Sequence, residues 1–306
     1  MRLHPMLQDI IDQSADLPAM ETLSPEQIRR GTEARYTSIP RPEVASVEDR
    51  MIPGPRGDIR IRIYRPNLAD NRPVIMFFHG SGFVICSLDT HDGLCRQLCK
   101  RSDMIVVSVD YALAPENKFP AGPDDSLAAT LWVAENAATF GGDAARLIVA
   151  GDSAGGTMAI VTVARIRDAG GPAISAQFLM YPVTCYPDPA PKSYSERGSG
   201  CGLTEGGMRW FWHQYLPRAS DGHNPHASPL LLASLEDMPP AYIITAEFDL
   251  LRDEGEAFSD RLKHAGVDTT LIRYADMNHG FMSLVGVLDR ADEALDAACG
   301  WLAERV

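Results

Sequence analysis

Residues 147–156 read LIVAGDSAGG, a short apolar run followed by a glycine-rich turn. The run is strand-like, and a helical stretch follows it at 154–169. The turn fits the pattern Gly-x-Ser-x-Gly and places Ser153 between strand and helix, the context in which this pattern carries a nucleophile. Gly151 and Gly155 would let strand and helix approach closely. The pattern alone is weak, because small residues are common in tight turns between a strand and a helix.

Apolar runs on both sides of this stretch predict the rest of a sheet. They alternate with helical stretches, and strands buried on both faces in such an alternation indicate an α/β fold with a mostly parallel sheet. The runs are VIMFF at 74–78, MIVVSV at 104–109, AQFLMY at 176–181, AYIITA at 241–246 and TTLIRY at 269–274, and the helical stretches lie at 90–101, 124–140, 253–265 and 289–304. Residues 44–52 and 59–64 alternate apolar and polar side chains instead, which predicts a half-buried antiparallel pair.

Two segments depart from this alternation. Residues 1–43 read as helices broken by prolines, and residues 182–240 form a long connection that contains the aromatic stretch RWFWHQY at 209–215. A connection of that length is typical of a functional insertion over the carboxyl edge of an α/β sheet. We therefore expect a core made of 44–181 and 241–306, with a cap assembled from 1–43 and 182–240.

Composition narrows the class of protein. The 306-residue chain is 45% hydrophobic and 23% charged, with a net charge of −13, which is ordinary for a soluble globular protein and disfavours nucleic acid and anionic membranes as partners. An apolar run of about 18 residues, as a membrane-spanning helix needs, is absent, and the first residues read as an amphipathic helix. The six cysteines show no metal-ligand spacing, so we expect reduced thiols, no metal and a cytoplasmic location.

A serine nucleophile needs a base and an acid that orients the base. His279 lies in DMNHGF, just past the run TTLIRY, where a loop at the carboxyl edge of the sheet is expected. Asp249 follows the run AYIITA by three residues and would lie at the same edge. We expect His279 as base and Asp249 as acid, while three other acidic residues remain competitors for the second role, namely Glu247, Asp253 and Asp276.

The tetrahedral intermediate of acyl transfer also needs hydrogen-bond donors for its oxyanion. HGSGF at 79–83 closes the run VIMFF, and a glycine-rich turn there would point backbone N–H groups at the space above the serine. The expected donors are the N–H groups of Gly80, Ser81 and Ala154. His79 is expected to brace the loop.

Six motifs together resemble the bacterial hormone-sensitive-lipase-like family (family IV) of α/β-hydrolase esterases, over nearly the whole chain. They are HGSGF, DYALAPENKFPAG at 110–122, GDSAGG, NPHASPLL at 224–231, FDLLRDEG at 248–255 and NHGF at 278–281. The resemblance implies an eight-stranded sheet with a helical cap, and a carboxylic ester hydrolase with the triad Ser153, His279 and Asp249. It also implies no metal or organic cofactor, short- to medium-chain acyl esters as substrates, and a homodimer through the edge strand at 269–274.

The chain departs from the family pattern at two positions. Ser81 replaces the middle glycine of the oxyanion motif, so the turn is strained if this position needs a positive φ, and the hydroxyl would add a donor or narrow the pocket. Leu250 replaces the proline after the acid, and we expect little chemical consequence.

By position, four residues are expected to line the substrate pocket, although a place in the cap core is an alternative for the aromatic ones in 209–215. They are Phe83, Trp210, Trp212 and Met282. Two rival functions remain. A serine amidase or peptidase would use the same residues, and a non-catalytic small-molecule-binding relative is disfavoured because all three triad positions are filled.

Overall fold

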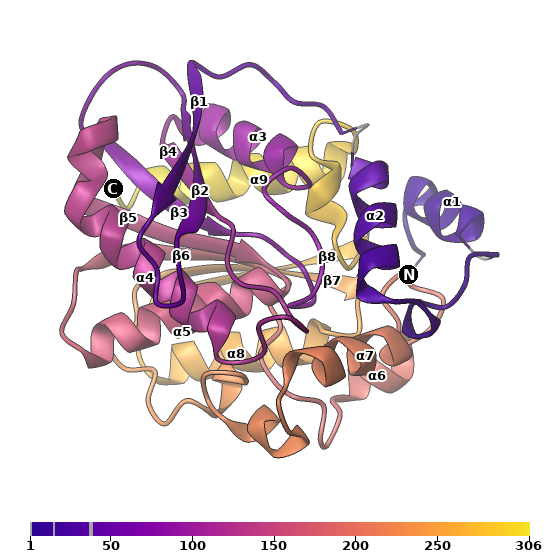
Figure 1. Cartoon of the computed structure of the whole chain (residues 1–306). Coiled ribbons are helices and arrows are strands. Elements are labelled where there is room, and N and C mark those ends of the chain that lie inside the picture. The colour runs from indigo at the N-terminus through magenta and orange to yellow at the C-terminus, as the bar shows by residue number, and fades with distance from the viewer. Residues whose placement is uncertain (1, 15, 37–38) are drawn as a thin grey trace.

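The computed structural model describes residues 2–14, 16–36 and 39–306, and within them a single sheet of eight strands has the order β1-β2-β4-β3-β5-β6-β7-β8 (Figure 1). The first three strands in this order pair antiparallel, and all other neighbours pair parallel. The prediction of a mostly parallel eight-stranded sheet is therefore confirmed. The strands are β1 (Ser46–Ile52), β2 (Ile59–Arg65), β3 (Arg72–Phe78), β4 (Ile105–Val109), β5 (Gly142–Asp152), β6 (Ile174–Met180), β7 (Ala241–Phe248) and β8 (Thr269–Asn278).

The predicted antiparallel pair is confirmed as β1 and β2, which align Ser46 with Arg65 and Ile52 with Ile59. The inner strands β3 and β4 have nearly all their side chains buried, as expected for strands covered on both faces. The other edge of the sheet is β8, whose middle residues are exposed or half-buried.

Helices cover both faces of the sheet (Figure 1). On one face α4 (Ala121–Asn136), α5 (Ala154–Asp168) and α8 (Arg252–His264) bury their apolar side chains against the strands. On the other face α3 (Asp92–Ser102) and α9 (Asp289–Ala303) pack against each other and the sheet. Cys95 and Cys99 of α3 are buried on the face of the helix that packs against the sheet.

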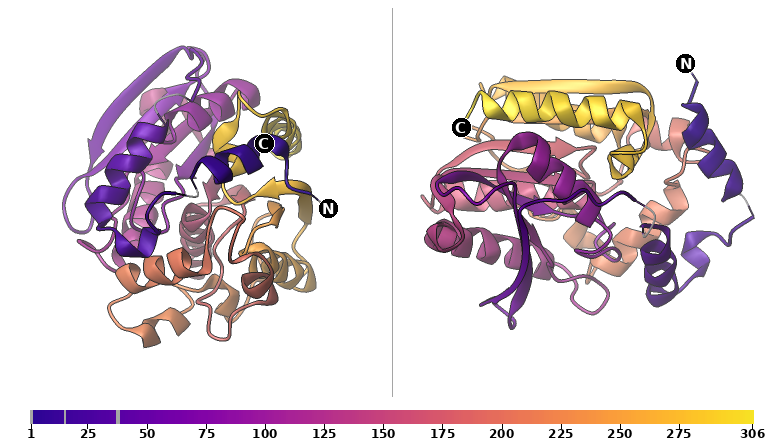
Figure 2. Two further views of the ribbon diagram at one scale, coloured as in Figure 1. Left: turned by 90° about the vertical axis from the view of Figure 1, so that its right-hand side faces the viewer. Right: turned by 90° about the horizontal axis from the view of Figure 1, so that it is seen from above.

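Two segments far apart in the sequence lie side by side beyond the carboxyl ends of the strands (Figures 1 and 2). The 3-10 turn η1 packs against α7, and the Glu21 carboxylate lies next to Gly206. The helices of the first segment are α1 (Pro5–Gln13), η1 (Met20–Thr22) and α2 (Pro25–Tyr36), and those of the second are α6 (Lys192–Arg197), α7 (Glu205–Tyr215), η3 (Ala219–His223) and η4 (Pro229–Leu231). The remaining 3-10 turns are η2 (Ala137–Phe140) and η5 (Phe281–Leu284).

In the described part of the chain, no helix combines the length and the apolar character that crossing a bilayer requires. The same residues contain no group of three or more His, Cys, Asp or Glu side chains arranged to hold a metal ion.

Candidate active site

Ser153 lies in the sharp turn between β5 and α5, with φ 54° and ψ −121°. This conformation is rarely adopted by residues other than glycine. The flanking glycines make the turn feasible, because a Cβ at Gly151 would overlap the Gly155 carbonyl and a Cβ at Gly155 would overlap the Phe78 carbonyl. The expectation that Gly151 and Gly155 must lack side chains is confirmed.

The structure brings Ser153 together with His279 and Asp249, which follow the carboxyl ends of β8 and β7. His279 Nε2 lies 2.9 Å from Ser153 Oγ, and His279 Nδ1 lies 2.8 Å from Asp249 Oδ2. Asp249 Oδ1 accepts the Leu251 N–H at 2.9 Å. Since a carboxylate can only accept, Nδ1 carries the imidazole proton and Nε2 accepts from the serine hydroxyl. Gly280, with φ 81°, provides the bend after the histidine.

The three competing acidic residues have other partners. Glu247 forms ion pairs with Arg197, Arg252 and Arg273. Asp253 pairs with Arg252, and Asp276 pairs with Arg290. Of the four acidic candidates, Asp249 is the one that contacts His279.

Two residues that the sequence analysis did not single out support His279. The Tyr181 ring packs edge-on against the imidazole, with ring centroids 4.9 Å apart and an angle of 60° between the rings. Asn278 Nδ2 donates to the Cys201 carbonyl at 3.0 Å and so ties the histidine loop to the 182–240 segment. Both contacts depend on tertiary packing, which the sequence does not display. The one sequence signal for these two residues was their position at the ends of β6 and β8.

The loop after β3 corrects one expected oxyanion donor. The Gly80 N–H donates to Asp152 Oδ1 at 2.6 Å, so it is not free to bind a substrate oxygen. The N–H groups of Ser81, Gly82 and Ala154 have no hydrogen-bond acceptor in the described part of the chain. Gly82, with φ 51°, was not among the expected donors, although its place in HGSGF next to Ser81 could have suggested it as a candidate.

Asp152 is a buried carboxylate directly before the serine. Burial by itself would raise the pKa of Asp152, but His91 and the Gly80 N–H outweigh burial and hold that pKa below its ordinary value. His91 Nε2 lies 3.3 Å from Asp152 Oδ1. Burial lowers the pKa of His79 to about 3, with His91 adding to the effect, so His79 is neutral. The His79 ring stacks on Tyr111 at 4.6 Å, an arrangement consistent with bracing the loop.

Comparison with known proteins gives the family. A family model described as the alpha/beta hydrolase fold matches residues 75–283. Esterase LipI of Mycobacterium tuberculosis is 43% identical over 268 residues, covering 85% of this chain and 83% of LipI. An ethyl acetate hydrolase of Pseudomonas putida is 36% identical over 241 residues, covering 77% and 75%. The crystal structure of a hyperthermophilic esterase from the archaeon Pyrobaculum calidifontis superposes with a TM-score of 0.92 at 39% identity, covering 99% of both chains.

The chain belongs to the hormone-sensitive-lipase-like family of α/β-hydrolases. The predicted enzyme class is thereby confirmed, and the chain is a carboxylesterase.

In this family member, the residues expected to line the substrate pocket occupy different environments. Phe83 and Met282 are fully buried, and the Phe83 ring stacks on Tyr215 with centroids 3.9 Å apart. Trp210 is half-buried and packs edge-on against Phe211. Their contact with a substrate stays a prediction.

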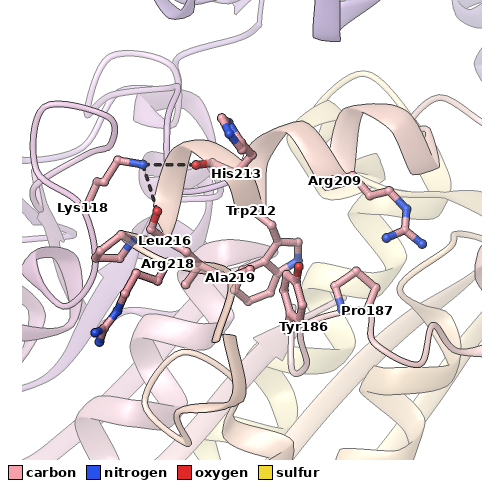
Figure 3. A pocket seen from close by; sticks show the side chains of 10 residues that line it. Lys118, Tyr186, Pro187, Arg209, Trp212, His213, Leu216, Arg218 and Ala219 are labelled. Atoms are coloured by element: carbon pink, nitrogen blue, oxygen red, sulfur yellow. Dashed lines mark hydrogen bonds between the residues drawn. The ribbon is translucent and has the colours of Figure 1, made fainter. Parts of the chain in front are cut away.

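Trp212 lines a pocket of about 290 Å³ beside α7 and the loop that follows it (Figure 3). Tyr186 and Leu216 are among its apolar lining residues, and Lys118 Nζ, which also lines it, donates to the carbonyls of His213 and Leu216. The Trp212 ring also packs against Phe83, with ring centroids 5.2 Å apart. Trp212 therefore contacts both this pocket and Phe83, the residue that follows Ser81 and Gly82 in the loop.

A smaller pocket of about 60 Å³ lies directly against His279. It is bounded by Leu7 and Ile10 of α1, by Tyr36 at the end of α2, and by the histidine loop 278–284. The helices of residues 1–43 thus border the catalytic candidate itself.

Proposed function

We propose that this carboxylesterase hydrolyses short- to medium-chain acyl esters through an acyl-enzyme formed on Ser153. The observation that carries the proposal is the hydrogen-bonded chain from Ser153 Oγ to His279 Nε2 and from His279 Nδ1 to Asp249, at 2.9 and 2.8 Å. These distances are those of a nucleophile, a base and an orienting acid.

In the first half of the reaction, Ser153 Oγ attacks the ester carbonyl carbon while His279 Nε2 accepts the hydroxyl proton. The tetrahedral intermediate collapses, and His279 returns that proton to the leaving alcohol. In the second half a water molecule takes the place of the alcohol, and its attack releases the carboxylic acid and regenerates Ser153. Asp249 keeps the imidazole in one tautomer and stabilises its positive charge.

The oxyanion would be held by the N–H groups of Ser81, Gly82 and Ala154. Ala154 is the first residue of α5, so the positive end of that helix also faces the developing charge. Gly80 serves a different purpose, since its N–H fastens the loop to Asp152.

Three further expectations belong to this proposal. Residues 1–43 and 182–240 form a cap, supported by their contacts with one another and with the histidine loop. A short-chain preference is supported by the small volume beside His279 and by the Pseudomonas putida relative. The protein is a cytoplasmic homodimer that pairs through β8, whose Ile272 is 38% exposed.

The test compares p-nitrophenyl esters with a matched p-nitroanilide, using wild type and Ser153→Ala. We expect ester turnover that Ser153→Ala reduces by about 10⁴-fold or more. Faster anilide turnover would favour the amidase, and a folded wild-type protein that binds esters without turning them over would favour the binding protein. Undiminished turnover in Ser153→Ala would remove the serine mechanism.

A further inference from the structure

Ser81 places a buried hydroxyl inside the loop where the family motif has glycine. The backbone at Ser81 does not adopt a positive φ, so the strain considered for this substitution is absent. Ser81 Oγ lies 2.7 Å from Tyr111 Oη and accepts the Phe83 N–H at 2.8 Å. Tyr111 Oη in turn donates to the His79 carbonyl at 2.6 Å. Each of these four side chains is at most 3% exposed.

The number of protons sets the direction of every bond in this group. Tyr111 Oη has one hydrogen, and the His79 carbonyl, which can only accept, takes it. The Ser81 hydroxyl must therefore donate to Tyr111 Oη, and it accepts from the Phe83 N–H. The result is one directed chain from Phe83 through Ser81 and Tyr111 to His79, in which each bond polarises the next.

This series of hydrogen bonds starts and ends on the same loop and encloses Gly80 to Gly82. The Ser81 carbonyl adds to it by accepting the N–H groups of Val84 and Ile85 at 3.0 and 2.9 Å. From the opposite side, Asp152 holds the Gly80 N–H. The Ser81 and Gly82 N–H groups lie between these two attachments, so their directions are fixed before a substrate arrives.

We propose that the Ser81 hydroxyl is a positioning group for the oxyanion hole, acting with Tyr111 to aim the Ser81 and Gly82 N–H groups. The inference rests on the proposed acyl-transfer function. The loop needs such support because Phe83 has φ 69°, an unfavourable conformation for an aromatic residue. Without the Ser81 hydroxyl, the buried Phe83 N–H loses its acceptor and Tyr111 Oη loses its donor.

The test uses Ser81→Ala and Ser81→Gly, with Ser259→Ala as the matched control because the buried Ser259 hydroxyl has no hydrogen-bond partner among the described residues. Tyr111→Phe is paired with Tyr215→Phe, whose buried hydroxyl likewise has no partner there. For each variant one measures kcat and KM for one p-nitrophenyl ester, the second-order rate of phosphonylation by a fluorophosphonate, and Tm.

Both Ser81 variants are expected to lose about tenfold in kcat and in phosphonylation rate, since donors that are present but misaimed stabilise the oxyanion less. KM should stay within about twofold, because the loss falls on the transition state. Ser81→Ala combined with Tyr111→Phe should be no worse than Tyr111→Phe alone. Both control variants should match wild type.

A kcat within twofold of wild type in both Ser81 variants would overturn the inference. Full activity in Ser81→Gly together with a loss in Ser81→Ala would also overturn it, because the loss would then come from the Cβ and not from the missing hydroxyl. If Tyr111→Phe does not fold, the two Ser81 variants and Ser259→Ala decide the question by themselves. Activity remaining in Ser153→Ala would instead overturn the proposed function, so the two failures can be told apart.

Discussion

Ser153 depends on its glycine neighbours for the backbone conformation that exposes its hydroxyl to His279. Strain of this kind persists only where the surrounding structure holds it in place. Here the Ser153 N–H donates to the Met180 carbonyl at 2.9 Å, and its carbonyl accepts the N–H groups of Gly156 and Val183. The turn is thus bonded to β6 and to the segment that follows β6. The absence of a Cβ at Gly151 and Gly155 leaves room for the start of α5 to pack closely on the ends of β5 and β3.

Gly155→Ala should be severely destabilising, because its Cβ would overlap the Phe78 backbone carbonyl, which cannot move without disturbing β3. Gly300→Ala is the matched control, since a Cβ at this helical position in α9 meets nothing within 4 Å. The control should be neutral or more stable by about 0.5–1 kcal/mol, from helix propensity alone. Urea unfolding measures the free energy of unfolding of both variants and of wild type. Equal stabilities would contradict the assigned role of Gly155.

Asp249→Asn should reduce kcat on the order of 10⁴-fold, because an amide in place of the carboxylate no longer selects the tautomer with the proton on Nδ1. Asp276→Asn provides the control, since this acid lies three residues from His279 in sequence but faces Arg290. Steady-state kinetics on one ester suffices. A greater loss of kcat in Asp276→Asn than in Asp249→Asn would assign the orienting acid to Asp276 instead.

Among the helices, α7 packs on the loop that carries Ser81 and Gly82. The Phe211 ring lies so close to Gly82 that a Cβ there would come within 2.5 Å of it. Trp212, the next residue, and Tyr215, one turn further along, pack on Phe83. The side chains of α7 therefore pack on the loop and also line the pocket of about 290 Å³.

Trp212→Ala should shift the acyl preference toward longer chains, because removal of the indole opens the space beside Phe83 to the pocket of Figure 3. The ratio of kcat/KM for octanoate to that for butanoate p-nitrophenyl esters measures the shift. Trp132→Ala in α4 controls for the general cost of losing a tryptophan. An unchanged ratio would place Trp212 in the cap core alone.

Glu254, at the start of α8, accepts the N–H groups of Thr184 and Cys185 and joins this helix to the segment after β6. Burial raises the pKa of Glu254 to about 8 from an ordinary value of 4.5. Between these values the folded state binds more protons than the unfolded state, so the free energy of unfolding falls as the pH rises. The slope is at most about 1.4 kcal/mol per pH unit.

Glu254→Gln should remove that part of the pH dependence, because the amide does not titrate. Urea unfolding at intervals from pH 5 to pH 8 compares wild type, Glu254→Gln and the exposed control Glu236→Gln. We expect a flatter profile in the first variant and an unchanged one in the control. A wild-type stability that rises over this interval, with the same slope in Glu254→Gln, would contradict the assignment.

The triad positions could be predicted from sequence for a topological reason. Ser153, Asp249 and His279 follow the parallel strands β5, β7 and β8, and the carboxyl ends of parallel strands meet at one edge of the sheet. The role of Gly80 could not be predicted, because it depends on a bond to Asp152, 72 residues away in sequence. For the same reason, neither the support of His279 by Tyr181 nor the course of the Ser81 hydroxyl bonds could be read from any motif.

At the scale of the whole molecule, the complete candidate triad lies within one chain, so assembly is not needed to build it. The sheet has two edges, β1 and β8, and each carries a partly exposed apolar residue, Val47 at 37% and Ile272 at 38%. An unpaired edge of this kind can pair with another copy.

If β8 forms the dimer, wild type should sediment at twice the chain mass and Ile272→Glu should sediment as a monomer with activity retained per chain. Val47→Glu, at the opposite edge, should stay dimeric. Sedimentation velocity distinguishes the three proteins. A monomeric wild type would remove the dimer proposal, and a monomer produced by Val47→Glu alone would move the interface to β1.

Ser153, activated by His279, is the proposed nucleophile. The most direct measurement is intact mass and peptide mapping after reaction with a fluorophosphonate. We predict one adduct per chain, located on Ser153, absent in Ser153→Ala and formed far more slowly in His279→Ala. An adduct on another residue would contradict the assignment of Ser153 as nucleophile. So would an unlabelled Ser153→Ala variant that still hydrolyses the ester.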